Sequence, residues 1–596
     1  MSTISSDTLI DTEKHFKISA GPGAGKTRWL VNHIKNVLSN STRLNSVNNI
    51  ACITYTNVAV QEIKTRLKDK SARVDVSTIH SFLYRNLVKP YAYLAKDNQS
   101  NSIIIDMKEL DGHDEHQPNT KYIMEWLNNI NPRYNFLYKE ENKPKLKKIL
   151  SGLRYIFTSQ ELLLDIAPNQ IPLARELRFP STIIKSKEFF AYKKMYWQEG
   201  IIDHEDVLYL SCQLLKQNPI LVDILRCKYP YIFIDEFQDT NPIQTEIVKM
   251  LASPKCIVGI IGDYNQSIYG FQGAKPKDFR DFSIGGIVEY QIADNWRSTQ
   301  KIINTLNNFT STQQKCKRNM EGTIPSIIVG NLQNTLTFIK QKESELSTSN
   351  LTSIILTKDN ADLRNIKTNL NLQQCQYSGN LWDDFKIKEE NKKERYNLIS
   401  QTLKSYQYAK DKKMELALNE FLKLFKKKPF NIIKDKLKQR TISLEILELC
   451  INCGDINEKT IKEFYYLLKE KLKIYNIKLS SYSKGNAATF VETHSVVDML
   501  KQLNITEYKT EVSTIHGAKG TEYDMVSLFI FDDGNQKAEN KLKNFITNPN
   551  LQNEKHRRKY VAMSRAKDYL FIIIPELSEE NEQLISNARL YNTIRV

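Results

Sequence analysis

Residues 16–27 read FKISAGPGAGKT, and the segment after them places Trp29, Leu30, Ile34 and Val37 at helical spacing. The pattern predicts a short buried strand, a glycine-rich loop, a Lys-Thr pair and a helix, which is the context of a Walker A phosphate-binding loop. Glycines let backbone N–H groups turn toward phosphate oxygens, and a helix N-terminus adds a favourable field. A glycine-rich turn with a chance lysine is the alternative, and the flanking strand and helix disfavour it.

The loop predicts ATP and Mg²⁺ as cofactors. We expect Lys26 to contact the β- and γ-phosphates and Thr27 to ligate Mg²⁺. The remaining residues expected to line the nucleotide are Gly21, Gly23, Ala24 and Gly25.

A second segment, YIFIDE at residues 231–236, predicts the other half of the same site. Its apolar strand would deliver two adjacent carboxylates at a carboxyl end, where ligands bind in parallel α/β sheets. Asp235 would hold Mg²⁺ through water, and Glu236 would orient the attacking water and take its proton. Two acids could instead form a solvated turn, but this reading is weak beside an upstream Walker A loop.

The segment DEFQDTN at residues 235–241, followed by Gln244, resembles motif II of the UvrD/Rep/PcrA-like helicases of superfamily 1. Segments similar to the family's other motifs occur in the expected chain order on both sides of it. Before it lie ITYTN (53–57), STIHSF (77–82) and the acidic segment IDHED (202–206); after it lie GDYNQSIY (262–269), NWRS (295–298), TIHGAKGTE (514–522) and YVAMSRA (560–566). The resemblance implies an α/β fold with two RecA-like P-loop lobes, each carrying a mainly helical insertion.

The resemblance also implies roles for residues around the nucleotide. Arginines placed near the γ-phosphoryl group stabilise charge that develops during hydrolysis. The implied roles are γ-phosphate contact for Arg297, Arg565 and Gln266, ribose binding for Glu522, and adenine stacking between Arg28 and Trp296.

A third set of residues is implied to bind nucleic acid, mainly through phosphates, which position a strand without reading its sequence. The set is Thr54, Tyr55, Asn57, Thr78, His80, Phe271, Thr514 and His516. Phe271 is where the family places a base-stacking aromatic, although a core role is the open alternative, since aromatics are usually buried.

The chain departs from the family pattern at several positions. No glutamine precedes Ala20, so the family's adenine-reading glutamine is missing and base selectivity is open. Gln272 replaces the usual arginine after the motif III aromatic, which would weaken coupling between DNA and ATP. Thr521 and Ser564 replace the usual Leu and Thr of motifs V and VI.

The motifs divide the chain into six segments. We expect the first lobe at 1–88 and 186–293, its insertion at 89–185, the second lobe at 294–384 and 506–596, and its insertion at 385–505. The run FLKLFKKK at 421–428 is read as a helix with a solvated basic face or as a duplex-contacting patch. Apolar residues of the second insertion (Ile442, Ile446, Leu447, Phe464, Leu467, Leu468) suggest a docking surface, with a local core as the alternative.

Composition agrees with a multidomain protein that binds a polyanion. A chain of 596 residues is longer than one hydrophobic core usually covers, so several domains are expected. The net charge of +17 fits a solvated basic surface or a partner with a phosphate backbone, and charge alone does not decide between them. No segment is long and apolar enough for a signal peptide or membrane span, so a cytoplasmic location is expected. Cys450 and Cys453 could form half a zinc site, but two unlinked thiols are the simpler reading.

These features predict an ATP-dependent DNA helicase or translocase, with single-stranded DNA and DNA junctions as partners and 3′-to-5′ movement implied by the family alone. The alternative is a DNA-gated ATPase switch or scaffold that regulates a partner nuclease with little unwinding. Only a short segment follows Arg565, so no appended nuclease is expected. The compact size resembles helicase subunits of phage-defence systems such as Gabija, and DNA repair is the other expected setting.

Overall fold

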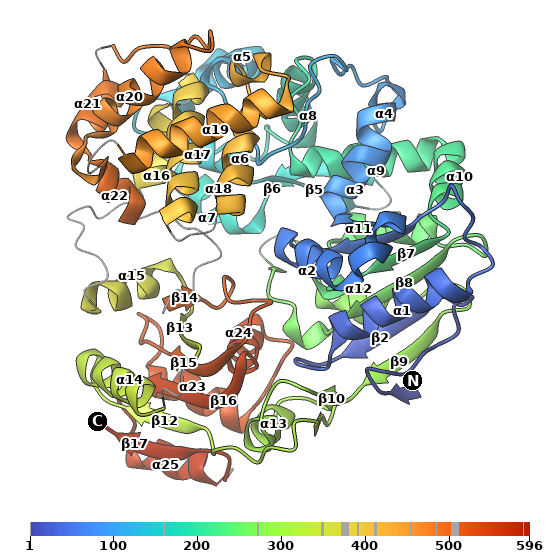
Figure 1. Ribbon diagram of the computed structural model, residues 1–596, viewed down its shortest axis with the longest axis vertical. Helices are drawn as coiled ribbons and strands as arrows, with labels where there is room; N and C mark the ends of the chain where they lie inside the picture. The colour runs from blue at the N-terminus through green and yellow to red at the C-terminus, as the bar shows by residue number, and fades with distance from the viewer. Residues whose placement is uncertain are drawn as a thin grey trace. The chain divides into compact units, whose positions relative to one another are not determined.

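The computed structural model describes residues 2–158, 161–270, 273–346, 351–370, 381–389, 392–410, 414–452, 456–483, 485–501, 512–587 and 589–596. They form two compact units, Met1–Leu363 with Thr510–Val596, and Arg364–Lys509. Figure 1 shows the first unit as two α/β lobes, each built on its own sheet. The predicted fold class is confirmed.

The first sheet has seven strands, all parallel. In spatial order they are β1 (Ser2–Ile4), β9 (Val288–Ile292), β2 (Phe16–Ala20), β8 (Ile257–Gly262), β7 (Tyr231–Ile234), β3 (Ile50–Thr54) and β4 (Val74–Thr78). The strand predicted at 16–20 is β2, with the same bounds. Parallel sheets are buried on both faces, which explains the nearly continuous apolar runs of β3, β7 and β8.

Helices cover both faces of this sheet. One face packs on α1 (Lys26–Asn40) and α2 (Asn57–Leu67). The other packs on α3 (Ile79–Leu83), α9 (His204–Gln217), α10 (Pro219–Lys228), α11 (Pro242–Leu251) and α12 (Pro276–Arg280). Along β3 the side chains alternate between the two cores, since Cys52 belongs to the first and Ile53 to the second.

The insertion of the first lobe continues the second of these cores. Its helices are α4 (Lys89–Tyr91), α5 (Thr120–Ile130), α6 (Lys143–Ser151), α7 (Ile171–Glu176) and α8 (Ser186–Trp197). Trp126 and Trp197 are buried in the same cluster as Ile53 and Ile234 of the sheet, so the insertion has no separate core. It also contains an antiparallel pair, β5 (Leu153–Thr158) and β6 (Glu161–Ile166), which the helical expectation omitted.

The second sheet has six parallel strands. Their order is β14 (Val512–Thr514), β13 (Ser353–Thr357), β15 (Tyr523–Phe529), β16 (Ala566–Ile574), β12 (Ser326–Val329) and β17 (Asn592–Arg595). Helices of this lobe are α13 (Gln300–Asn307), α14 (Leu332–Leu346), α15 (Asn360–Asn369), α23 (Ala538–Thr547), α24 (Glu554–Met563) and α25 (Glu579–Ser586). The strand predicted at 353–357 is β13.

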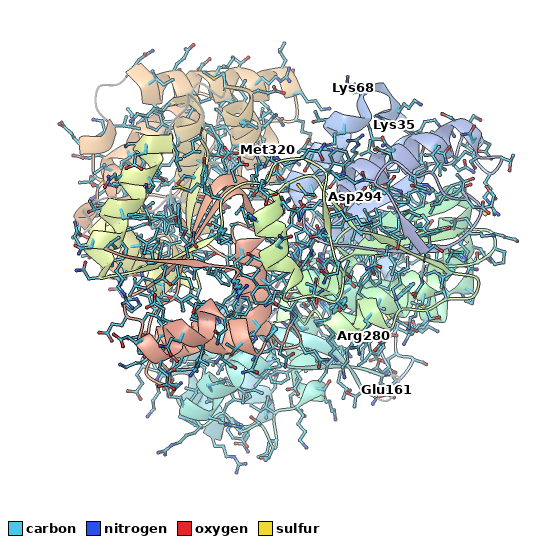
Figure 2. The ribbon with its side chains drawn as sticks, turned by 90° about the horizontal axis from the view of Figure 1, so that it is seen from below. Lys35, Lys68, Glu161, Arg280, Asp294 and Met320 are labelled. Carbon is cyan, nitrogen blue, oxygen red and sulfur yellow. The ribbon has the colours of Figure 1, made fainter. Side chains whose placement is uncertain are left out.

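A short parallel pair, β10 (Asp294–Asn295) and β11 (Lys315–Cys316), follows the last strand of the first sheet. Asp294, labelled in Figure 2, marks where the chain leaves that sheet.

The unit Arg364–Lys509 is helical where it is described and has its own core. Its main helices are α16 (Leu381–Lys388), α17 (Lys393–Lys410), α18 (Met414–Leu422), α19 (Lys436–Asn452), α20 (Ile461–Lys473), α21 (Asn486–Thr493) and α22 (Val496–Lys501). Of the apolar residues considered for docking, all but the half-buried Leu467 are buried inside the unit, so they form its core rather than a docking surface.

The basic run of this unit is amphipathic. Phe421, Leu424 and Phe425 are buried, and the side chain of Lys423 is exposed and paired with Glu420. Cys450 is buried, whereas Cys453 lies outside the described residues, so the expectation of two unlinked thiols stays a prediction.

Among the residues that the structure describes, no helix combines the length and apolarity needed to cross a membrane.

Candidate active site and nucleic-acid interface

The predicted site residues of the first lobe lie at one edge of its sheet. The phosphate loop follows β2, the Asp-Glu pair follows β7, and motif III follows β8. Thr54 and Thr78 are the last residues of β3 and β4. Because all five strands are parallel, their carboxyl ends share an edge, where α/β sheets bind ligands.

The phosphate loop is held open by its glycines and by residues that follow the sheet. Gly23 and Gly25 have φ values of 68° and 80°, in the region that favours glycine. Asn295 Nδ2 and Gln314 Nε2 donate to the Pro22 carbonyl at 3.1 and 3.0 Å. A Cβ at Gly21 would lie 2.6 Å from Gln314 Nε2, so a larger residue there would displace the Gln314 side chain from this contact.

Lys26 is the first residue of α1, and Thr27 is half-buried beside it. The Lys26 ammonium donates to the carbonyl oxygens of Ala20 and Gly21 at 3.1 and 3.3 Å. A mobile ammonium at the loop can therefore exchange two neutral acceptors for charged phosphate oxygens, which bind it more strongly.

Asp235 and Glu236 are both buried, and their surroundings shift their pKa values in opposite directions. Burial and the adjacent Glu236 raise the pKa of Asp235 to about 7. Burial also acts on Glu236, but Lys26, Lys519 and a hydrogen bond from Gln238 lower the pKa of Glu236 below its ordinary value. Glu236 is therefore ionised at neutral pH and able to accept a proton.

Arg565, which immediately precedes β16 of the second lobe, reaches the first lobe. Its Nη2 donates to Gln266 Oε1 at 2.6 Å, and Gln266 Nε2 donates to Asp263 Oδ2 at 2.8 Å. Within the described part of the chain, its hydrogen-bond acceptors are neutral oxygens of Val561, Thr521, Gln266 and Ser564. Burial and the nearby Arg297 lower the pKa of Arg565 to about 9, so the guanidinium remains charged at neutral pH. The carboxylates of Glu236 and Glu522 act in the opposite direction and favour the charged guanidinium.

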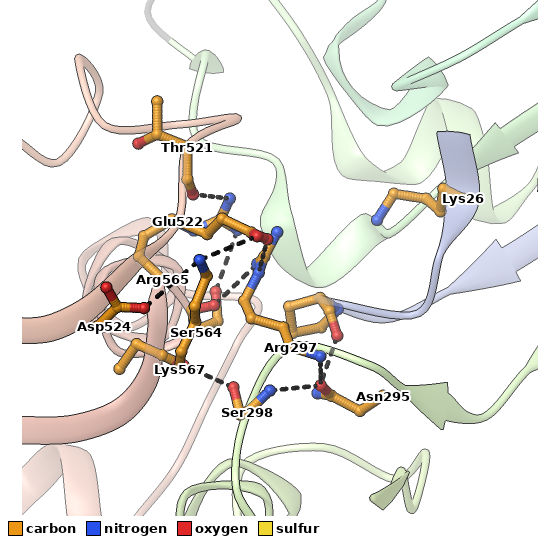
Figure 3. Close-up of polar contacts among 12 residues, drawn as sticks. Lys26, Asn295, Arg297, Ser298, Thr521, Glu522, Asp524, Ser564, Arg565 and Lys567 are labelled. Carbon is orange, nitrogen blue, oxygen red and sulfur yellow. Dashed lines mark hydrogen bonds and ion pairs between the residues drawn. The ribbon is translucent and has the colours of Figure 1, made fainter. Parts of the chain in front are cut away.

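Arg297 supplies a second cation to the same place. Its Nε donates to Glu522 Oε2 at 2.9 Å, and its Nη1 donates to the Ser564 carbonyl at 2.9 Å. Figure 3 shows Arg297 and Arg565 beside each other, with Lys26 directed toward them from the first lobe. Glu522, expected at the ribose, thus also positions one of these arginines.

The residues expected at the base lie together. The Arg28 guanidinium carbon is 5.4 Å from the centroid of the Trp296 ring. Trp296 is 41% exposed, and its backbone N–H donates to the Gly23 carbonyl at 2.8 Å. This contact fixes the indole to the phosphate loop.

An aromatic chain crosses between the lobes near this site. The Tyr55 and Tyr269 rings stack with centroids 4.8 Å apart, and Tyr269 lies 5.9 Å from His516 of the second lobe. The Ile268 carbonyl lies 3.1 Å from His516 Nε2. The structure therefore brings Tyr55 and His516 to one place through Tyr269, which motif III contains but which had no assigned role.

The other expected strand contacts differ in position. Thr54 is buried, Asn57 is exposed, and Thr78 and Thr514 are half-buried. His80 packs against His204, with ring centroids 5.3 Å apart. Phe271 and Gln272 lie outside the described residues, so their roles stay predictions.

Lys519 lies in motif V, but no role was expected for it from the sequence. Its Nζ forms an ion pair with Asp239, donates to the Gln266 carbonyl at 2.9 Å, and lies 4.7 Å from the centroid of the Tyr269 ring. Its signal in the sequence was a lysine inside a motif, which does not say what it contacts.

The fold and the phosphate loop together define a two-lobed P-loop ATPase. Sequence comparison agrees: residues 2–284 match the UvrD/REP helicase N-terminal domain, and residues 380–576 match the UvrD-like helicase C-terminal domain. The chain belongs to the UvrD-like helicases of superfamily 1, which are ATP-hydrolysing DNA helicases.

Similar proteins support this assignment over most of the chain. The ATP-dependent DNA helicase Rep of Buchnera aphidicola subsp. Schizaphis graminum is 26% identical, over 93% of this chain and 90% of its own length. A probable DNA helicase II homolog of Mycoplasma pneumoniae is 26% identical, over 93% of this chain and 81% of its own. The ATP-dependent DNA helicase PcrA of Staphylococcus aureus is 26% identical, over 52% of this chain and 39% of its own.

Proposed function

We propose that this protein is a motor that moves 3′ to 5′ along single-stranded DNA and separates duplex at DNA junctions. The direction rests on the family resemblance. The observation that supports motor action is Lys519, a single side chain that contacts Asp239, the Gln266 carbonyl and the Tyr269 ring. Because one ammonium group makes all three contacts, a movement of Asp239, Gln266 or Tyr269 shifts this group relative to the other two residues.

Hydrolysis at this site uses charges from both lobes. Lys26 binds the terminal phosphates, and the ionised Glu236 orients the attacking water and takes its proton. Arg565 and Arg297 stabilise the charge that develops on the γ-phosphoryl oxygens, and Gln266 holds Arg565 in place. Because the arginines belong to the second-lobe side, the site is complete only when both lobes meet on the nucleotide.

The residues present fit a bound Mg²⁺. Mg²⁺ usually takes one or two carboxylates together with substrate phosphates and water, and a dense cluster of protein ligands is not expected; the described residues contain none. Burial and the neighbouring Glu236 raise the pKa of Asp235, and a divalent cation would offset this by stabilising the ionised carboxylate. Asp235 and the Thr27 hydroxyl would hold the ion, which would neutralise phosphate charge.

Strand movement requires that bases of the single strand stack on the rings of Tyr55 or Tyr269. Stacking on Tyr55 or Tyr269 is worth about 1–3 kcal/mol per base and tolerates any sequence. Tyr55 belongs to the first lobe and His516 to the second, so closure and opening change the surface offered to the strand. Repeated cycles of closure and opening then move the contacts between the protein and DNA along the strand.

The test is ATP hydrolysis and strand displacement by the full chain on duplexes with a 3′ or a 5′ single-stranded tail. We expect DNA-stimulated hydrolysis with both tails and displacement only from the 3′-tailed duplex. Rapid stimulated hydrolysis without displacement from either substrate would instead favour a DNA-gated switch that regulates a partner such as a nuclease.

A further inference from the structure

The helix α19 packs on the rest of its unit through one face. Its buried residues Ile442, Ile446 and Cys450 belong to the core of the unit. Leu447 joins a smaller cluster with Ala409 of α17 and Ala417 of α18, and Figure 1 shows α19 beside these two helices. The opposite face of α19 is exposed.

The exposed face carries three large aliphatic side chains in a row. Leu437, Leu444 and Ile451 are 75%, 40% and 49% exposed. Each is seven residues from the next, which is about two helical turns, so the three form one stripe along the helix. A single exposed aliphatic residue is normal on a protein surface. Three at heptad spacing instead form the kind of seam along which one helix packs against another.

Two residues of opposite charge lie in the same stripe, at mirrored positions. Arg440 comes four residues before Leu444, Glu448 comes four residues after it, and both are exposed. Neither has an opposite charge three or four residues away in α19, where ion pairs within a helix form. Neither forms an ion pair with another residue in the part of the chain that the structure describes. Both charges are therefore available to a partner.

An antiparallel copy of the same helix complements both the apolar and the charged residues of this stripe. With Leu444 on a two-fold axis, Leu437 faces Ile451 of the second copy, and Leu444 faces its own counterpart. Arg440 then faces Glu448 of the second copy, and the symmetry forms this ion pair twice. A parallel pair would instead place Arg440 opposite Arg440 and Glu448 opposite Glu448, and such like-charge contacts disfavour that orientation.

We propose that the exposed stripe of α19 is a self-association surface, through which two copies of the chain form a two-fold symmetric dimer with their α19 helices antiparallel. The helix has 17 residues, which corresponds to a length of about 25 Å. One helix pair of this length buries less than the roughly 800 Å² per partner of a standard stable interface. The dimer is therefore weak, with a dissociation constant in the micromolar range.

The test is sedimentation velocity of the full chain, without DNA, across the micromolar range. We expect the mass to rise from monomer to dimer with concentration. Leu444→Lys places two ammonium groups at the two-fold axis and should leave a monomer at every concentration, while thermal unfolding and DNA-stimulated ATP hydrolysis match wild type. Ile220→Lys is the matched control, because Ile220 is an exposed aliphatic residue on α10 of the first lobe; it should leave dimerisation unchanged.

Charge reversal tests the antiparallel geometry. Arg440→Glu alone and Glu448→Arg alone each place like charges at both symmetric contacts, so each should raise the dissociation constant at least about tenfold. The double variant restores opposite charges across the axis and should return the dissociation constant to within about threefold of wild type. A wild-type chain that stays monomeric, a dimer that survives Leu444→Lys, or a double variant as weak as the two single variants would overturn the proposal.

Discussion

Replacing Arg565 by alanine should abolish most turnover, and it should also lower thermal stability because it leaves backbone acceptors unpaired. Arg565 is a buried cation whose described acceptors are neutral oxygens, so its charge is available to the γ-phosphoryl group. Two unit charges about 4 Å apart at an effective dielectric of about 20 interact by about 4 kcal/mol. Since about 1.4 kcal/mol is tenfold in rate, kcat should fall roughly a thousandfold.

The assay is steady-state ATP hydrolysis with saturating single-stranded DNA, together with thermal unfolding. Arg565→Lys keeps a charge but loses the planar fork, so it should recover only part of the rate. Arg557, in α24 shortly before Arg565, is the matched control, because it is also buried and donates to the backbone carbonyls of Ser267, Leu551 and Gln552. Its removal tests the effect of unpaired acceptors without removing the cation beside Gln266. Arg557→Ala should lower thermal stability, since it leaves those acceptors unpaired. An Arg565→Ala enzyme that keeps kcat within about tenfold of wild type would refute the role of this arginine.

Three further predictions test other parts of the site. Lys26→Ala should eliminate ATP turnover. Glu236→Gln should bind ATP but hydrolyse it slowly, so that filter binding recovers the trapped nucleotide. Near-normal turnover in either variant would refute the assignment of the ATP site. Tyr269→Ala should lower the DNA-stimulated rate at least about tenfold, and stimulation of wild type should weaken with salt as phosphate contacts are screened. Equal DNA-stimulated rates for wild type and Tyr269→Ala would exclude base stacking on this ring. Burial and neighbouring histidines lower the pKa of His80 to about 3 and of His113 to about 4, so below pH 6.5 the unfolded chain takes up protons that the folded chain does not. The free energy of unfolding should therefore fall by about 1.4 kcal/mol per pH unit for each histidine as pH drops from 6.5 toward 4, and thermal unfolding of His113→Asn should show a smaller dependence on pH.

One strand in each lobe could be predicted from local sequence. The strand at 16–20 and the strand at 353–357 have the predicted bounds, because each is a short β-branched or aromatic run beside a clear loop signal. The pairing of Asp235 with the phosphate loop followed from the rule that parallel strands share a carboxyl edge.

The contacts that join the lobes could not be predicted in the same way. Lys519 and Asp239 are 280 residues apart in sequence, and no local pattern says that they meet. The stacking of Tyr55 on Tyr269 could not be predicted either, since each ring alone would be interpreted as a core aromatic.

The insertions show a different limit. β5 and β6 carry alternating burial, with Tyr155 and Leu164 inward and Ile156 exposed, but short strands among helices are easily read as helix. The apolar residues of α19 and α20 fit both a core and a docking face by periodicity, and only packing decides in favour of the core.

The central claim is that ATP hydrolysis moves this protein along a single strand. The direct measurement is displacement of streptavidin from biotin at the 5′ or the 3′ end of a single-stranded oligonucleotide, which requires movement but no unwinding. The account predicts ATP-dependent displacement from the 5′ end, none from the 3′ end, and none from either end with Lys26→Ala. Rapid DNA-stimulated hydrolysis that leaves streptavidin bound at both ends would contradict it.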